Sequence, residues 1–196
     1  GPSIIMKILA FSGSSRKAST NQQLIEELAR LAVAGNSEVE SRCVILADYP
    51  MPIYQGDEEQ TRGLPEPAAE FKKLLQDHDA FIIGNPEYNG FMTPLLLNTI
   101  DWCTRSADAS PDLSAFANKI VLIAGTSPGA LGALRVAVHL RTMLSGIGCV
   151  VVPQPFSVPS GFSAFNPDGS FADQAMNKRA SKAMMDFTGF VGKLTN

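Results

Sequence analysis

The sequence predicts an α/β fold in which helices cover both faces of a parallel sheet. Short strand-like runs, most of them largely apolar, alternate with longer segments whose apolar residues recur at helical spacing, five times in succession. Such alternation is typical of parallel sheets, and continuous apolar runs are typical of strands buried on both faces. The 196-residue length suits one domain with its own core.

Each element follows from its local pattern. The five predicted strands are Met6–Phe11, Val39–Leu46, Ala80–Gly84, Lys119–Gly125 and Cys149–Val152. Apolar residues spaced three or four apart predict the five helices, over 24–32, 71–75, 95–105, 134–144 and 176–194. Two segments without such periodicity, 48–67 and 153–168, are predicted to be long loops.

Five strand–helix units suit a doubly wound sheet in the flavodoxin-like strand order 2-1-3-4-5. A Rossmann dinucleotide fold is the alternative, but it requires Gly-x-Gly-x-x-Gly after the first strand. That loop reads Ser12-Gly13-Ser14-Ser15-Arg16 here and lacks the spacing. Ligands of open parallel sheets bind at the carboxyl ends of the strands. The loops after the first, third and fourth strands are therefore the places to look for a site.

Composition excludes several classes of protein. A net charge of −3 argues against a nucleic-acid partner. Three widely spaced cysteines (Cys43, Cys103 and Cys149) and only two histidines predict no metal cluster and no disulfide framework. No segment approaches the ~20 apolar residues of a membrane helix. We expect a cytoplasmic protein with no membrane partner.

The N-terminal Gly1-Pro2-Ser3 resembles what remains after removal of an expression tag. We therefore take residues 1–5 as a tag remnant and Met6 as the native start. Residues 6–196 then form the single predicted domain.

The loop after the first strand has the chemistry of a phosphate site. It supplies hydroxyls, an amide, a glycine and an arginine where a helix begins and presents free N–H groups. The candidates are Ser14, Arg16, Ser19, Thr20 and Asn21. The alternative is a capped loop, with Ser19 or Thr20 as the N-cap and Arg16 in solvent.

The loop after the third strand suits a flat ring system. Pro86 stiffens its start, Gly90 permits close approach of the backbone, and Tyr88 offers an aromatic wall. The alternative is a turn before a helix capped by Thr93, with Pro94 in its first turn, and the two are compatible. The loop after the fourth strand, 126–132, fits either a ligand wall or an ordinary turn.

No side-chain catalytic arrangement accompanies these loops. His139 has no Cys, or Ser and Asp, partner in the pattern of a hydrolase, and neither a Gly-x-Ser-x-Gly elbow nor a P-loop occurs.

Three stretches resemble the NADPH-dependent FMN reductase family, which includes bacterial quinone, chromate and azo-dye reductases. They are 13–21, the block Pro86-Glu87-Tyr88-Asn89-Gly90 continuing to Trp102, and 127–141. The likeness runs from about residue 6 to 153 in the same order and spacing. It implies non-covalent FMN, NADPH or NADH as donor, and a homodimer or homotetramer.

The resemblance also implies roles for residues. Ser14, Arg16, Ser19, Thr20 and Asn21 would hold the FMN phosphate. The isoalloxazine ring would be lined by Pro86, Glu87, Tyr88, Asn89 and Gly90, with Ser127 closing the far side. No catalytic side chain is assigned, because the cofactor carries the chemistry.

The sequence departs from the family pattern at Leu97, where many relatives have lysine, at Ala133, where a second glycine is common, and over Phe91–Thr93. These changes leave the acceptor and the subunit packing open. Arg16, Arg105 and Arg135 are all candidate partners for a 2′-phosphate, so the choice between NADPH and NADH stays open as well.

The predicted activity is hydride transfer from a reduced nicotinamide, through bound FMN, to a quinone, an azo or nitro compound, a metal oxyanion or free flavin. The alternatives are a flavodoxin-like electron carrier and a flavin-binding sensor without turnover. A phosphate loop poorer in threonine and glycine than in carriers, together with the second block, favours the reductase.

Overall fold

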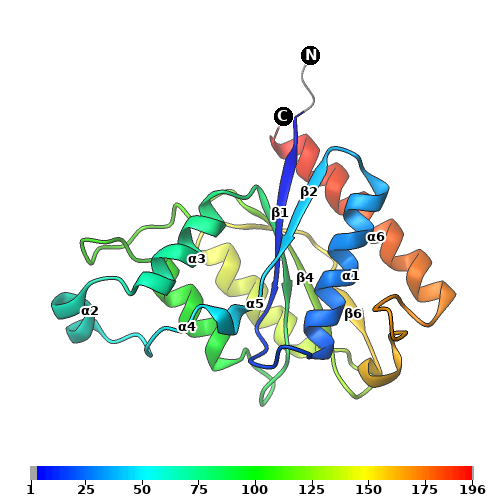
Figure 1. Ribbon diagram of the computed structural model, residues 1–196, viewed down its shortest axis with the longest axis horizontal. Helices are drawn as coiled ribbons and strands as arrows, with labels where there is room; N and C mark the ends of the chain where they lie inside the picture. The colour runs from blue at the N-terminus through cyan, green and yellow to red at the C-terminus, as the bar shows by residue number, and fades with distance from the viewer. Residues whose placement is uncertain (1–3, 196) are drawn as a thin grey trace.

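A parallel sheet separates two layers of helices in the computed structural model, which describes residues 4–195 (Figure 1). The strand order is β2-β1-β3-β4-β5, and every pairing is parallel. The strands are β1 (Met6–Ser12), β2 (Val39–Cys43), β3 (Ala80–Gly84), β4 (Ile120–Thr126), β5 (Val150–Val151) and β6 (Phe156–Val158). The predicted flavodoxin-like order is confirmed.

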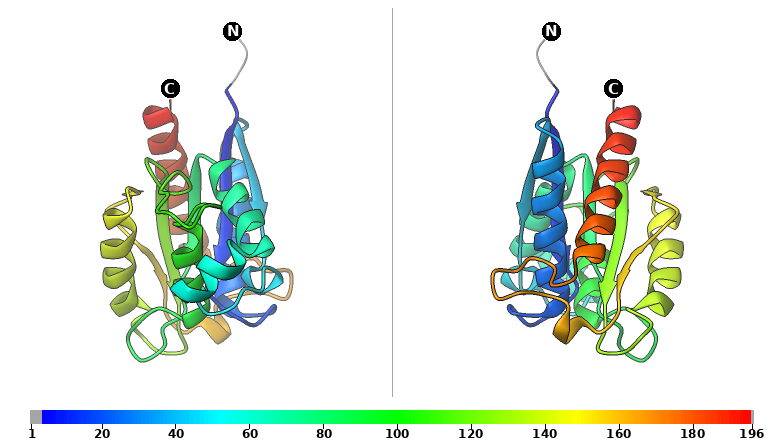
Figure 2. Two further views of the ribbon diagram at one scale, coloured as in Figure 1. Left: turned by 90° about the vertical axis from the view of Figure 1, so that its left-hand side faces the viewer. Right: turned by 90° about the vertical axis from the view of Figure 1, so that its right-hand side faces the viewer.

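The helices divide between the two faces of the sheet. They are α1 (Thr20–Gly35), α2 (Gly56–Arg62), α3 (Glu66–Gln76), α4 (Pro94–Cys103), α5 (Leu134–Gly146) and α6 (Gln174–Thr195). Figure 2 shows α1 and α6 side by side on one face. Alternate residues of β1 explain the division, because Ile8 and Ala10 pack with α1 and α6 while Leu9 and Phe11 pack with α3, α4 and α5.

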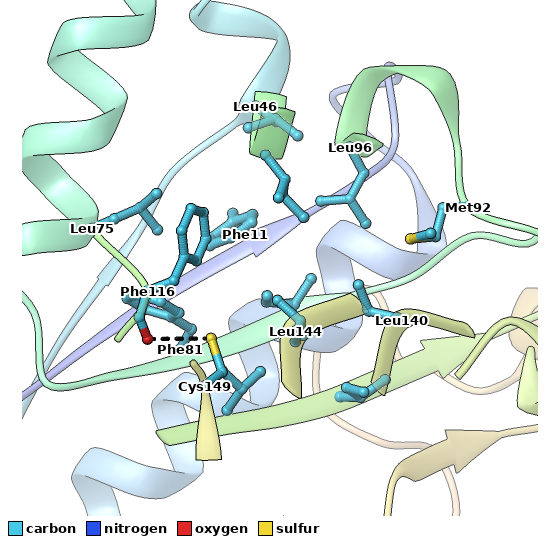
Figure 3. Close-up of a cluster of buried hydrophobic side chains, with 14 of the residues drawn as sticks. Phe11, Leu46, Leu75, Phe81, Met92, Leu96, Phe116, Leu140, Leu144 and Cys149 are labelled. Carbon is cyan, nitrogen blue, oxygen red and sulfur yellow. Dashed lines mark hydrogen bonds between the residues drawn. The ribbon is translucent and has the colours of Figure 1, made fainter. Parts of the chain in front are cut away.

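Aromatic rings fill the layer between the sheet and α3–α5 (Figure 3). The rings of Phe11 and Phe71 meet edge to face, with centroids 5.2 Å apart, and Phe81 approaches Phe116 in the same way. Such pairs stabilise a core by about 0.5–1.5 kcal/mol beyond the area they bury. This packing fixes β1, β3 and β4, whose carboxyl ends carry the three loops of interest.

The segment 48–67, predicted to be a loop, contains secondary structure. β2 ends at Cys43 rather than at Leu46, which begins a 3-10 turn (Leu46–Asp48), and α2 follows. Contacts distant in sequence hold the segment: Arg105 donates to Glu59 (Nε–Oε2 2.8 Å), and Trp102 Nε1 donates to the carbonyl of Pro52 (2.7 Å). Local periodicity contains no information about such contacts, so this prediction was wrong.

The fifth strand is broken into two pieces. Val121 of β4 pairs with Val151 of β5, whereas Ala124 pairs with Phe156 of β6. Three steps along β4 therefore correspond to five along its neighbour, and the extra residues bulge out. Arg141 of α5 covers this break, since its Nη2 donates to the carbonyls of Val152 and Pro153, both at 2.8 Å.

The start of β1 and the end of α6 lie away from the candidate loops. β1 begins and α6 ends at one end of the sheet, and the loops after β1, β3 and β4 lie at the other (Figure 1). Gly1-Pro2-Ser3, interpreted as a tag remnant, lies outside the described residues. Within residues 4–195, no helix combines the length and the apolar character needed to cross a membrane.

Candidate functional site

The carboxyl ends of β1, β3 and β4 surround one cavity of about 740 Å³. Its size lies within the range of small-molecule sites, ~300–1,000 Å³. Nine of the eleven predicted residues line it: Ser14, Arg16, Ser19, Thr20, Asn21, Pro86, Glu87, Tyr88 and Ser127. The three loops therefore converge as the sheet topology predicts.

Hydroxyl groups shape the loop between β1 and α1. Ser12 Oγ accepts from the N–H of Ser14 (3.0 Å), and Ser14 Oγ accepts from the N–H of Arg16 (3.1 Å). Ser19 is the N-cap of α1, with its Oγ accepting from the N–H of Gln22 (3.0 Å). Each serine acts here as an acceptor and keeps its O–H free to donate to an anion. Arg16 is exposed beside them.

Asn21 reaches the cavity, but its amide already has partners. Its Nδ2 donates to the carbonyl of Thr126 and its Oδ1 accepts from the N–H of the same residue, both at 3.1 Å. This reciprocal pair joins the first turn of α1 to the end of β4. Asn21 therefore holds two walls of the cavity in register, a positioning role different from the phosphate contact that the resemblance implies.

Two buried polar side chains at this edge of the sheet lack hydrogen-bond partners within residues 4–195. They are Asn85, with neither amide atom bonded, and Thr126, whose Oγ1 is free. Thr126 lines the cavity, and Asn85 directly precedes the lining residue Pro86. Buried polar groups are nearly always satisfied, so two unpartnered side chains beside one cavity set this edge of the sheet apart from the rest of the core.

The loop after β3 is a two-residue hairpin. Tyr88 and Phe91 exchange backbone hydrogen bonds of 2.9 and 3.0 Å, and Asn89 and Gly90 between them have φ of +53° and +72°. An Asn-Gly pair with positive φ is typical of a type I′ turn. The positive φ of Gly90 serves this turn, and neither Gly90 nor Asn89 lines the cavity.

Glu87 joins this hairpin to α5. Its Oε1 accepts from the backbone N–H of Val136 in the first turn of the helix (3.2 Å). A carboxylate is favoured there, since helix N-termini carry partial positive charge. The contact fixes the position of Tyr88, whose side chain is 47% exposed at the cavity.

A fourth wall was missed from the sequence. The segment 161–169, between β6 and α6, contributes Gly161, Phe162, Phe165, Asn166, Pro167 and Gly169 to the lining. Asn166-Pro167-Asp168-Gly169 forms a turn closed by a bond from the N–H of Asn166 to the carbonyl of Ser170 (2.8 Å). The turn residues were visible in the sequence, but their position depends on β6 pairing with β4.

The arginines considered for nicotinamide binding are differently placed. Arg105 is engaged with Glu59 through Nε and Nη2, away from the cavity. Arg135 and His139 lie exposed on α5 and do not line the cavity either, and the His139 ring instead packs 5.0 Å from that of Phe91. Arg16 is the one member of this group at the cavity.

This strand order, with a polar cavity at a helix N-terminus, defines a flavodoxin-like α/β protein with a small-molecule site. The family described as NADPH-dependent FMN reductase matches residues 6–163. The chain belongs to that family, and it is an NAD(P)H-dependent oxidoreductase of the FMN and quinone reductase type.

Similar proteins agree with this assignment. An NAD(P)H-dependent FMN reductase of Pseudomonas aeruginosa is 31% identical over 170 residues, which cover 86% of this chain and 85% of that one. A quinone reductase of Escherichia coli is 32% identical over 150 residues, covering 76% and 75%. The structure of FerB, a flavoenzyme NAD(P)H:(acceptor) oxidoreductase from Paracoccus denitrificans, superposes with a TM-score of 0.81 at 27% identity, covering 96% and 98%.

Proposed function

We propose that the protein binds FMN in the cavity and uses NAD(P)H to reduce a small acceptor such as a quinone. The observation that carries this proposal is the convergence of three loops on one cavity, with a helix N-terminus on one wall and a half-exposed tyrosine on another. The names of the relatives support both the cofactor and the class of acceptor.

The phosphate would lie at the start of α1. Ser14, Ser19 and Thr20 can donate hydroxyl protons there, and Arg16 can add a charge-assisted bond. The N-terminus of α1 contributes its own partial positive charge. Acidic residues are absent from the first turn of α1, so nothing there opposes an anion.

The ring would lie between the 86–88 stretch and Ser127. Pro86 and Tyr88 offer apolar surface to it. When bound, FMN would supply the redox chemistry by accepting a hydride from the nicotinamide and delivering two electrons to the acceptor. The protein's residues orient both reactants.

The remaining expectations become part of the proposal. Residues 6–196 would form one domain, and the protein would assemble as a homodimer or homotetramer. Three free cysteines suit a reducing compartment such as the cytoplasm. The acceptor is a small molecule, with quinones the first to test because relatives carry that name.

The decisive experiment is an absorption spectrum of the purified protein with added FMN, followed by anaerobic NADPH. A protein-bound band near ~450 nm that bleaches on NADPH addition is the expected result. A band that persists would instead support a carrier or sensor, and failure to bind FMN would remove the proposal.

A variant tests the site itself. Arg16→Ala should weaken FMN binding by about tenfold, the loss of one charge-assisted contact of roughly 1.4 kcal/mol. Riboflavin, which lacks the phosphate, should bind the variant and the wild type equally. An equal loss for both ligands would place Arg16 elsewhere than at the phosphate.

A further inference from the structure

The segment 161–169 presents an aromatic side chain that the chain itself does not bury. Phe162 lies in the 3-10 turn Gly161–Ser163, lines the cavity and is 82% exposed. Burying an aromatic ring is one of the larger favourable contributions open to a side chain. Phe162 leaves most of its ring in solvent and so gains little of this stabilisation, although it lies beside a ligand-sized cavity.

The backbone under Phe162 is fixed. Ser160 adopts φ +53°, a conformation that non-glycine residues seldom take. Its N–H donates to the carbonyl of Gly129 (3.0 Å), and the N–H of Gly161 donates to that of Ser127 (2.9 Å). A Cβ on Gly161 would overlap Thr126 Oγ1, so the turn lies tight against the end of β4. Strain held in this way is a mark of functional sites.

These bonds attach the turn to the loop after β4. Under the proposed function, Ser127 of that loop lies beside the FMN ring. Tyr88 reaches the same cavity from the hairpin after β3. The cavity thus has two exposed aromatic side chains on separate segments, Tyr88 and Phe162, and neither belongs to the phosphate loop.

We propose that Phe162 packs against the planar acceptor while the acceptor exchanges electrons with the cofactor, and so favours planar quinones over compact acceptors. A flat apolar ring suits stacking on another flat ring, and it offers nothing specific to an octahedral ion. This inference rests on the proposed function and adds a specificity residue to it.

The test compares two acceptors in one enzyme. In a ping-pong reaction, kcat/KM for the acceptor reports only the half-reaction with that acceptor. For Phe162→Ala loaded with FMN, we expect kcat/KM for menadione to fall by about three- to tenfold, the loss of one ring–ring contact. The value for ferricyanide, which is not planar, should not change, and Phe162→Tyr should restore the menadione value.

Met185→Ala is the matched control, because Met185 is also exposed (63%) but lies on α6 and does not line the cavity. It should leave both acceptors unaffected. Equal kinetics of Phe162→Ala and wild type with menadione would overturn the inference, as would an equal loss with both acceptors.

Two further measurements separate the other roles that Phe162 could have. The affinity for FMN should stay within about twofold of the wild type, since the proposed contact is to the acceptor. A larger change would make Phe162 a cofactor contact, and a change in the size of the assembly would make it an interface residue, and either result contradicts the inference. If the wild type neither binds FMN nor oxidises NADPH, the proposed function fails first and the inference falls with it.

Discussion

Gly84 and Gly189 differ in how closely other atoms pack around them. A Cβ on Gly84, at the end of β3, would lie 2.7 Å from Ile25 Cγ2 and 3.1 Å from the carbonyl oxygen of Asn21. A Cβ on Gly189, in α6, would meet nothing within 4 Å. Gly84 allows α1 to lie directly against the sheet, whereas Gly189 only loosens a helix.

Alanine substitutions should therefore change stability in opposite directions. Gly84→Ala is expected to lower the free energy of unfolding by about 1–3 kcal/mol through overpacking. Gly189→Ala should raise it by about 0.5–1 kcal/mol, because alanine favours the helix. Urea denaturation measures both, and a neutral Gly84→Ala would show that α1 can move away at little cost.

Tyr88 allows a residue-level test of the cavity. Its side chain is half-exposed, so Tyr88→Ala should change the free energy of unfolding by no more than about 0.5 kcal/mol. Turnover with NADPH and a quinone should fall by about tenfold in kcat/KM. Thermal unfolding measures the change in stability, and steady-state kinetics measure the change in kcat/KM. Unchanged kinetics would remove Tyr88 from the site.

At this scale the sequence predicted which residues gather but not what each contacts. Ser14 and Ser127 could be placed together because consecutive parallel strands bring their loops to one edge. That the Asn21 amide bonds to Thr126, 105 residues away, depends on the final packing of α1 against β4. The position of Phe162 likewise depends on a long-range contact, the pairing of β6 with β4.

At the scale of elements, a nearly buried ion pair holds the segment around α2. The Glu59 side chain is 1% exposed, and it accepts from Arg105 at 2.8 and 3.0 Å and from the hydroxyl of Tyr54 at 2.9 Å. The hydrogen bonds from Arg105, more than that from Tyr54, lower the pKa of the Glu59 carboxyl below its ordinary value of 4.5. Removing one partner of such a pair leaves a buried charge unpaired.

The pair should make stability depend on pH in a defined direction. Because the pKa of Glu59 is lowered in the folded state, its contribution is complete above about pH 4.5 and is lost as pH falls through the lowered value. Arg105→Ala should lower the free energy of unfolding at pH 7 by about 3 kcal/mol. The wild type and Glu59→Gln should converge in thermal stability as the pH falls below 4.5 and through the lowered pKa of Glu59.

Lys73→Ala supplies the control for that experiment. Lys73 pairs with Asp77 at 2.7 Å, but both side chains are well exposed, and such pairs contribute about 0–1 kcal/mol. If Lys73→Ala lowered the free energy of unfolding as much as Arg105→Ala does, burial would not be what makes the Glu59–Arg105 pair stabilising.

Elements with strong periodicity were predicted well, and elements held by distant contacts were not. α1 and β3 follow from their own residues, and the predicted caps at Ser19 and Thr93 are confirmed by their hydrogen bonds to Gln22 and Leu96. α2 has few apolar residues of its own, and the Glu59–Arg105 pair spans 46 positions. No pattern within the segment could have indicated it.

At the scale of the whole molecule, apolar side chains stay uncovered along one side of α5. Leu134 and Val138 lie four residues apart on one face of α5 and are 43% and 63% exposed, and Leu131, three residues before the helix begins, is 48% exposed. Phe91, from the hairpin beside the cavity, is 41% exposed and packs on His139 of the same helix. Exposed apolar side chains grouped on one helix in this way suit contact between subunits.

The proposed assembly should therefore depend on this face. Val138→Lys is expected to shift the protein towards a smaller species in sedimentation velocity, because a charge would be buried at the contact. Met185→Lys, equally exposed on α6, should leave the assembly intact. A Val138→Lys protein that keeps its wild-type size would place the interface on another face.

The global arrangement was the most predictable part, since strand order follows from the alternation of elements and the handedness of their connections. The break in the fifth strand was not predictable in the same way. It arises from Pro153 and Pro155, which have no N–H for the ladder, and from the side chain of Arg141 ten or more positions away.

That break has a consequence for how copies of the protein can meet. An outermost strand normally presents a row of free backbone groups on which a neighbour can continue the sheet. Here β5 is two residues long, Pro153 and Pro155 beyond it offer no donor, and the Arg141 guanidinium already binds the carbonyls of Val152 and Pro153. This margin of the sheet is therefore poorly suited to pairing with a strand of another copy, and disordered aggregation loses a point of nucleation there.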